Sequence, residues 1–309
     1  MIITVTLNPA LDKTLILPGF AVNTVNRVQD SRLDPGGKGI NVSKSVQALG
    51  GSTLAIGVLG GASGGYIKAA LDQLGLANDM VITGSTTRTN LKIMDPVLGT
   101  NTDINEPGSP ISEADLHKVW QKLSDAVKPG DTVVFAGKNP PEMDDGLLAE
   151  WIHRLKSLDV RVCVDTVGEP MRLALQEKPD IIKPNRDELS GLTGRALRKE
   201  ADIIAAAREL VDGGVGLVAV SLGGDGALFM TADQCIRGRC PKVAVASTVG
   251  AGDAMMAALA HYSGAGCSLE ETARRAVAVA TATVMYSGTK PAELTAILPM
   301  IDRVRIEYL

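Results

Sequence analysis

Aromatic residues are scarce in this sequence. Only 3% of the residues are aromatic: two Trp, four Tyr and three Phe. Proteins that bind single strands of nucleic acid stack bases on several exposed rings, and this composition argues against that class. The 31 basic residues are outnumbered by 35 acidic ones, giving a net charge of −4, so no overall basic field would attract a polyanion. We therefore expect no nucleic-acid partner and a core of Ala, Val, Leu and Ile.

Cysteine and histidine are also few, and neither is clustered. The four cysteines contain no C-x-x-C pair and the three histidines are scattered, so no zinc site is expected. No apolar run approaches the roughly 18 residues of a membrane span. The first seven residues indicate a strand and lack the basic region of a signal peptide. We expect a cytoplasmic protein with reduced thiols and no membrane contact.

Short β-branched runs alternate with segments of helical period. Strands are predicted at residues 2–7, 53–58, 132–136, 160–164, 217–221, 227–230 and 243–246, and helices at 40–49, 112–127, 147–158, 200–211, 253–261 and 269–285. Ser112 with Asp115 is typical of a helix start. This alternation predicts an α/β domain with a mostly parallel sheet covered on both faces. Two half-polar stretches, 15–33 and 88–104, predict a small β excursion.

Glycine is abundant, with 33 copies, and it gathers where strands pass into helices. Residues 35–41, 221–226 and 248–253 form three such loops. A glycine loop before a helix offers free N–H groups to phosphate. The Walker A pattern fails because Gly39 follows Lys38, and G-x-G-x-x-G is absent, which argues against a dehydrogenase. Taken alone, each loop is also compatible with a simple turn, and Asp253 with a helix N-cap.

Four motifs together resemble the ribokinase/PfkB carbohydrate kinases. They are Thr-Leu-Asn-Pro-Ala-Leu-Asp (6–12), Pro-Gly-Gly-Lys-Gly-Ile-Asn (35–41), Lys-Pro-Asn-Arg-Asp-Glu (183–188) and Thr-Val-Gly-Ala-Gly-Asp (248–253). They stand in the family's order and span nearly the whole chain. The resemblance implies a ribokinase-like three-layer α/β/α sandwich, a single domain over 1–309. It also implies a β lid formed by residues 12–34 and 86–106, and a homodimer joined through that lid.

The resemblance further implies transfer of the ATP γ-phosphoryl group to a ketohexose phosphate, with ATP and Mg²⁺ as cofactors. Asp253 matches the family's general base, and the loop of Gly250, Ala251 and Gly252 matches its anion hole. The matching sugar-binding residues are Asp12, Gly37, Lys38 and Asn41. Arg88, with Arg27 and Lys92, is expected to hold the phosphate already on the sugar, because guanidinium offers a planar fork of donors.

The nucleotide side of the site follows from the same resemblance. The expected nucleotide-binding residues are Lys183, Asn185, Ser221, Gly223 and Gly226. Asn185 and Glu188 lie one helical turn apart, and the family uses this pair to organise magnesium through its water shell. Asp165, at the end of a predicted strand, is a further candidate for the phosphate and metal network.

The identity of the sugar is less narrowly defined. Residues 87–92 and 102–105 most resemble the 1-phosphofructokinases, which implies fructose 1-phosphate as substrate and fructose 1,6-bisphosphate as product. Lys138 stands where the family usually has a Ser that approaches the substrate phosphate, and a lysine there would hold phosphate as a point charge. Tagatose 6-phosphate and fructose 6-phosphate therefore remain alternatives, as does a non-catalytic sugar-phosphate sensor.

Overall fold

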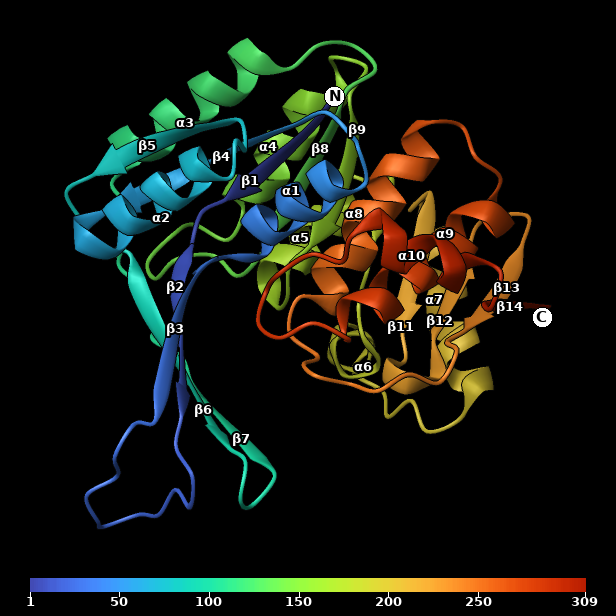
Figure 1. Ribbon diagram of the computed structural model, residues 1–309. Helices are drawn as coiled ribbons and strands as arrows, with labels where there is room; N and C mark the ends of the chain where they lie inside the picture. Colours follow the sequence, from blue (N-terminus) through green and yellow to red (C-terminus); the bar gives the residue numbers. More distant parts are fainter.

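The computed structural model describes residues 1–309 and contains two sheets (Figure 1). The larger sheet has ten strands in the order β14-β13-β12-β11-β10-β9-β8-β1-β4-β5. Seven of them, from β11 to β5, are parallel, and β12, β13 and β14 add an antiparallel edge. The strands are β1 (Ile2–Thr6), β4 (Thr53–Gly60), β5 (Asn78–Thr83), β8 (Thr132–Ala136), β9 (Arg161–Asp165), β10 (Ile181–Ile182), β11 (Leu217–Ser221), β12 (Ala227–Met230), β13 (Cys235–Arg239) and β14 (Arg305–Tyr308).

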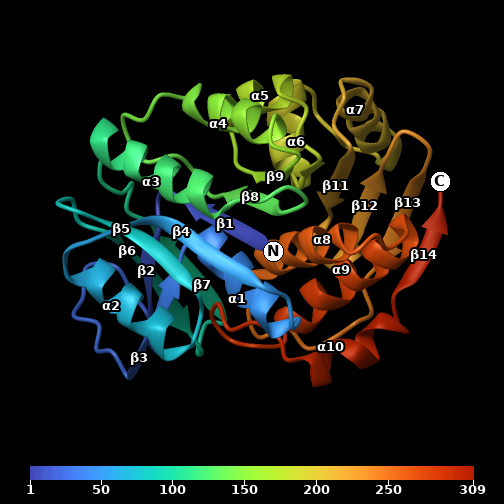
Figure 2. The same cartoon turned by 90° about the horizontal axis from the view of Figure 1, so that it is seen from above.

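Helices cover both faces of this sheet, giving the three layers that the sequence predicts (Figure 2). One face carries α3 (Glu113–Ala126), α4 (Leu147–Lys156), α5 (Glu169–Gln176), α6 (Arg186–Thr193) and α7 (Glu200–Asp212). The other carries α1 (Lys38–Ala48), α2 (Gly61–Gln73), α8 (Ala251–Gly264), α9 (Leu269–Thr283) and α10 (Leu294–Ile301). None of these helices has the length and hydropathy needed to cross a membrane.

Aliphatic residues fill the core, as the scarcity of aromatics predicts. Two large clusters lie on opposite faces of the ten-stranded sheet and consist mainly of Val, Leu, Ile and Ala. The helices α8 and α9 pack through alanines such as Ala257 and Ala276, which are fully buried. Small side chains let helix axes approach closely. All four cysteines are free thiols.

Most predicted elements are present, and Ser112 caps α3 by accepting a hydrogen bond from the Asp115 N–H at 3.1 Å. The strand predicted at 243–246 is wrong. That segment is irregular, and Val245 is 60% exposed because no strand lies beside it. The antiparallel edge is made instead by β13 and β14, from opposite ends of the C-terminal region. Neither β13 nor β14 has the continuous apolar run that predicts strands such as β11 and β12.

The two predicted excursions form a second, four-stranded sheet with the order β3-β2-β6-β7. Its strands are β2 (Ala10–Ile16), β3 (Asp30–Gly36), β6 (Arg88–Asp95) and β7 (Thr100–Ile104). This sheet, called the lid here, extends away from the body of the molecule (Figure 1). The pairs β2–β3 and β6–β7 are antiparallel, while β2 and β6 are parallel neighbours from distant parts of the chain.

Candidate active site

A pocket of about 550 Å³ lies between the lid and the carboxyl ends of the parallel strands. Open α/β sheets bind ligands at this end. The amino ends of α1 and α8 also face the pocket, so two helix dipoles favour negative charge there. The pocket brings together most residues predicted from the sequence: Asp12, Gly37, Lys38, Asn41, Arg88, Lys92, Asp165, Lys183, Asn185, Glu188, Ser221, Gly250, Gly252 and Asp253.

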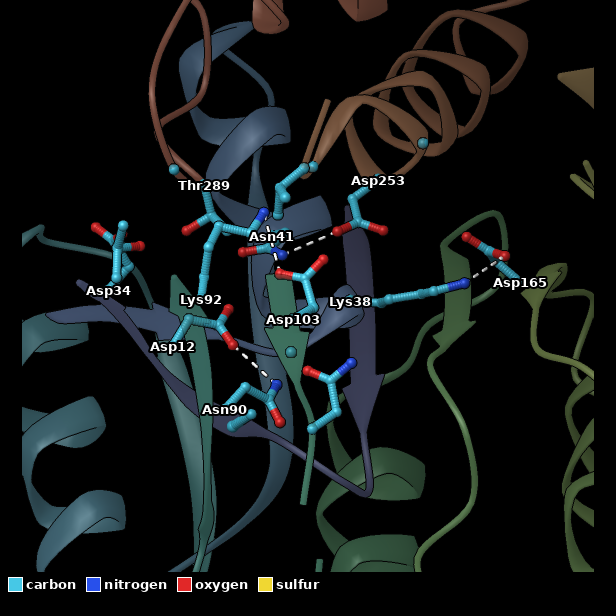
Figure 3. Close-up of a pocket in the computed structure, with 18 of the residues that line it drawn as sticks. Asp12, Asp34, Lys38, Asn41, Asn90, Lys92, Asp103, Asp165, Asp253 and Thr289 are labelled. Carbon is cyan, nitrogen blue, oxygen red and sulfur yellow. Dashed lines mark hydrogen bonds and ion pairs between the residues drawn. The ribbon is translucent and has the colours of Figure 1, made fainter. Parts of the chain in front are cut away.

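Asp253 lies in the first turn of α8 and is only 7% exposed. Its Oδ2 accepts a hydrogen bond from Asn41 Nδ2 at 2.9 Å (Figure 3). Burial, aided by the negative charge of Asp165, raises the pKa of Asp253 to about 6, although Asn41 and two lysines oppose the shift. The carboxylate is therefore ionised at neutral pH and has the proton affinity of a working base.

The backbone before Asp253 offers unused donors. The N–H groups of Gly252 and Asp253 have no main-chain acceptor, and that of Ala251 reaches Thr248 O only at 3.4 Å. A Cβ added to Gly252 would lie 3.2 Å from Lys183 Nζ, so this ammonium stands beside the loop. Free N–H groups, a helix dipole and a cation together form a site for anionic oxygen.

Two lysines converge on Asp165 at the end of β9. Lys38 Nζ lies 3.1 Å from Asp165 Oδ1, and Lys183 Nζ lies 3.3 Å from Oδ2. Burial of Asp165 alone would raise its pKa, but the charges of Lys183 and Lys38 outweigh it and hold the pKa below its ordinary value. The trio carries a net positive charge next to the glycine loop before α8, where phosphoryl oxygens would gather.

The lid faces the pocket with a row of polar side chains (Figure 3). Asp12 stands opposite both Asp34 and Asn90 in the strand registers, and Asn90 Nδ2 donates to Asp12 Oδ1 at 2.9 Å. A Cβ on Gly36 would lie 2.2 Å from Asp12 Oδ2, so only glycine admits this carboxylate. Two residues after Asn90 on β6, Lys92 Nζ forms an ion pair with Asp103 Oδ1 of β7 at 3.4 Å. The wall thus combines carboxylates for hydroxyl groups with a cation for phosphate.

Arg88 is partly committed to the protein main chain. Its Nη1 donates to Glu106 O at 2.8 Å and its Nη2 to Asn8 O at 3.1 Å, which joins β6 to two loops. Its Nε is buried without a partner. The guanidinium thus lies at the pocket with its charge available but much of its donor set already used.

Asn185 and Glu188 form a reciprocal capping box at the start of α6. Glu188 N–H donates to Asn185 Oδ1, and Asn185 N–H donates to Glu188 Oε2, both at 2.8 Å. The chain contains no cluster of three acidic, His or Cys side chains that could hold a metal by itself. Glu188 lines the pocket, and only its Oε2 takes part in the capping box. This arrangement fits Mg²⁺ brought in by phosphates and contacted through water, since Mg²⁺ keeps much of its water shell.

Some expected residues do not line the pocket. Arg27 is exposed in the loop between β2 and β3, and Lys138 is exposed beside a separate small cavity. Gly223 and Gly226 lie in the tight turn between β11 and β12 and do not line the pocket, whereas Ser221 at the end of β11 does. Within one chain, therefore, the structure brings neither Arg27 nor Lys138 to the acceptor side of the site.

The structure adds pocket residues to which the motifs assigned no role. Asp34, Asn90, Asp103 and Thr289 line the pocket, and Lys44 is buried behind it. The lid residues could have been found from the two-residue period of a strand. By this period Asp12 and Thr14 share one face of β2, and Asn90 and Lys92 share one face of β6, and all four line the pocket. Thr289 lies in an irregular segment and carries no such signal.

Comparison with known proteins gives consistent matches along the chain. The profile of the pfkB family of carbohydrate kinases matches residues 5–296. A 1-phosphofructokinase of Rhodobacter capsulatus is 40% identical over 278 residues, covering 90% of this chain and 88% of the relative. The ATP-dependent 6-phosphofructokinase isozyme 2 of Escherichia coli K12 is 33% identical, covering 94% of each chain. The crystal structure of phosphofructokinase-2 from Escherichia coli in complex with potassium superimposes with a TM-score of 0.94, at 32% identity and 98% coverage of both chains.

Proposed function

Because this chain belongs to the pfkB family of carbohydrate kinases, we propose that it transfers the γ-phosphoryl group of ATP to fructose 1-phosphate, forming fructose 1,6-bisphosphate. It is a sugar-phosphate kinase, and its several 1-phosphofructokinase relatives favour this substrate. The observation that carries the proposal is the position of Asp253. A buried carboxylate directly follows unused N–H groups at a helix start, across a pocket from a polar lid.

Asp253 accepts the proton of the attacking sugar hydroxyl as the new O–P bond forms, while the bond between the γ-phosphorus and the β-phosphate oxygen breaks and ADP leaves. Asn41 holds one carboxylate oxygen of Asp253 through its amide and so fixes the direction of the other. The N–H groups of Gly252 and Asp253 and the ammonium of Lys183 stabilise the charge on the phosphoryl oxygens during transfer. Each group is in place before the reaction, so little reorganisation is needed at the transition state.

The lid holds the acceptor. Asp12 and Asn90 bind sugar hydroxyls, and Lys92 with Arg88 faces the phosphate that the sugar already carries. The nucleotide occupies the side of Lys183, Asn185 and Ser221, where Glu188 would hold Mg²⁺ through water. When bound, Mg²⁺ would neutralise negative charge on the phosphates of the nucleotide. The enzyme is expected in the cytoplasm, where ATP is supplied.

A coupled ADP-release assay tests this function with fructose 1-phosphate, fructose 6-phosphate and tagatose 6-phosphate. The highest kcat/KM is expected with fructose 1-phosphate. A higher value with fructose 6-phosphate would favour the activity of the 6-phosphofructokinase relative. Binding of a sugar phosphate without any ADP release would identify a sensor and refute the kinase function.

We also propose that two chains associate through their lids. Exposed apolar side chains gather at the lid loops and on β7: Val22 is 81% exposed, Val97 70%, Leu98 61% and Ile104 51%. Exposed apolar patches of this kind are typical of interaction surfaces. A dimer would also carry Arg27, which lies in the same loop as Val22, toward another subunit. Sedimentation velocity measures the assembly directly.

A further inference from the structure

Lys44 is a buried lysine near the middle of α1, outside the pocket wall. It is 6% exposed, and lysines are almost never buried unless they are paired. Its Nζ donates to Pro35 O and to Thr289 Oγ1, both at 2.9 Å. Pro35 belongs to β3 of the lid, and Thr289 to the connection between α9 and α10. A single ammonium therefore joins a helix of the body, the base of the lid and a distant C-terminal segment.

The charge of Lys44 has no direct counter-ion. No carboxylate lies within ion-pair distance, and the third N–H of the ammonium has no acceptor. Burial lowers the pKa of Lys44 to about 8, while the charges of Asp34, Asp12 and Asp253 oppose the shift. The group is therefore mostly protonated at neutral pH. All three carboxylates line the pocket, whereas Lys44 does not. The ammonium of Lys44 therefore lies behind the part of the pocket wall that carries these carboxylates.

The pocket wall itself carries more negative than positive groups. Six carboxylates line it, against three lysines and one arginine. Both proposed substrates are anionic, yet the carboxylates of the pocket wall outnumber its lysines and arginine. The cations of the wall alone therefore do not neutralise the charge of these carboxylates. Lys44 supplies a positive charge there without occupying the space that a sugar needs.

The segment that holds Thr289 lies tightly against the lid. A Cβ on Gly288 would lie 2.2 Å from Arg32 Nη2 and 2.7 Å from Asp34 Oδ2, and its φ is +71°. Only glycine allows this approach. Thr289, Asp34 and Asp12 lie on the same side of the pocket (Figure 3). The hydrogen bond from Lys44 to Thr289 joins this segment to α1.

The same connection contacts the chain that leads to Asp253. The N–H groups of Ala246 and Ser247 donate to Val284 O at 2.8 and 3.2 Å. The segment from Val284 to Thr289 thus contacts the chain leading to the glycine loop before α8 at one end and β3 of the lid at the other. The relative position of these two walls decides whether a sugar hydroxyl reaches Asp253.

We propose that Lys44 is a positioning residue for the acceptor side of the site: by holding β3 and Thr289 together, it sets the lid carboxylates at the distance from Asp253 that a sugar phosphate requires. This inference rests on the proposed function. Lys44 does not contact substrate. Its loss should weaken binding of the sugar phosphate and spare binding of ATP, which lies on the other side of the pocket.

Kinetic measurements on variants test whether the KM for the sugar phosphate changes while the KM for ATP does not. Lys44→Met should raise the KM for fructose 1-phosphate by about tenfold, as expected for lost hydrogen bonds to a charged group, and change the KM for ATP by less than about twofold. Thr289→Val removes one of the two acceptors of Lys44 and should raise the KM for fructose 1-phosphate by a smaller factor. Thr289→Ser keeps the hydroxyl and should have the wild-type KM. Gln47→Met is the matched control, because Gln47 lies on the same helix but donates to Gly75 O.

The double variant Lys44→Met/Thr289→Val separates positioning from simple damage. Its effect on the sugar-phosphate KM should be less than the product of the single effects, because both remove one interaction. Equal rises in both KM values, or independent effects that multiply, would overturn the inference. So would an unchanged KM in Lys44→Met.

Amide hydrogen exchange tests the same inference without any turnover. In Lys44→Met, exchange should rise together at residues 30–36 and 284–293 and stay unchanged in α4. A rise confined to α1, or none, would refute the role of Lys44. Absence of kinase activity in the wild-type protein would refute the proposed function alone, so the two failures are distinguishable.

Discussion

Replacing Asp253 by Asn is the sharpest test of the chemistry. The two side chains have the same shape, and the remaining amide oxygen can still accept the hydrogen bond from Asn41 Nδ2. What is lost is the ability to take a proton. Loss of a general base costs about 10²–10⁴-fold, so kcat should fall by at least that factor while both KM values stay within about threefold.

The pH profile gives an independent reading of the same group. Burial raises the pKa of Asp253 to about 6, and only the ionised form accepts a proton. Relative to Asp253→Asn, wild-type kcat/KM should therefore be constant above that pH and fall by a further factor of about ten per unit below it. Sugar phosphates lose their second proton near pH 6 as well. The Asp253→Asn profile records that substrate titration alone and serves as the reference.

Stability should move in the opposite direction to activity. A raised pKa means that the folded protein disfavours the ionised carboxylate, so this cost is present above about pH 6 and absent below about pH 4. Asp253→Asn should raise the Tm at pH 7.5 and leave it unchanged near pH 4. Asp233→Asn, an exposed carboxylate in a loop, should change neither Tm nor kcat. A folded Asp253→Asn protein with near-normal turnover would refute the assignment of the base.

Three further outcomes are expected. Lys92→Met should raise the KM for fructose 1-phosphate by about tenfold through loss of a cation facing phosphate, measured by ADP release; an unchanged KM would place the phosphate elsewhere. Lys138→Ser should leave the kcat/KM ratios among the three sugar phosphates within about twofold, because Lys138 is exposed outside the pocket; a changed preference would return Lys138 to the site. Leu98→Asp should shift sedimentation from dimer to monomer by placing a charge in the lid contact, whereas a persistent dimer would argue for another interface.

The catalytic half of the site was largely predictable from the sequence. Its residues stand in short motifs at the ends of strands and the starts of helices, as with Asp165 after β9 and Asp253 in α8. Parallel strands bring their carboxyl ends to one edge, so motifs far apart in the chain must meet there. Local patterns and this rule were enough to predict where Asp253 and the glycine loop before it lie, whereas the roles expected of them came from the resemblance to the kinase family.

The acceptor half was harder to predict because it depends on pairing between strands. Asp34 and Asn90 flank Asp12 only through the registers of β2 with β3 and β6, and no local pattern fixes such a register. Lys44 gave no signal, since a lysine on an amphipathic helix normally indicates an exposed face. Its burial depends on Thr289, which is 245 residues away.

The pairing of β2 with β6 also constrains the order of folding. Asp12 meets Asn90, 78 residues later, and the strands between them include β4 and β5 of the large sheet. Closing so long a loop is entropically costly until the intervening body has formed and brought its ends together. The pairing of β2 with β6 should therefore follow the folding of β4 and β5, so that a partly denatured chain can keep Asp253 in place after it has lost the sheet that recognises a sugar.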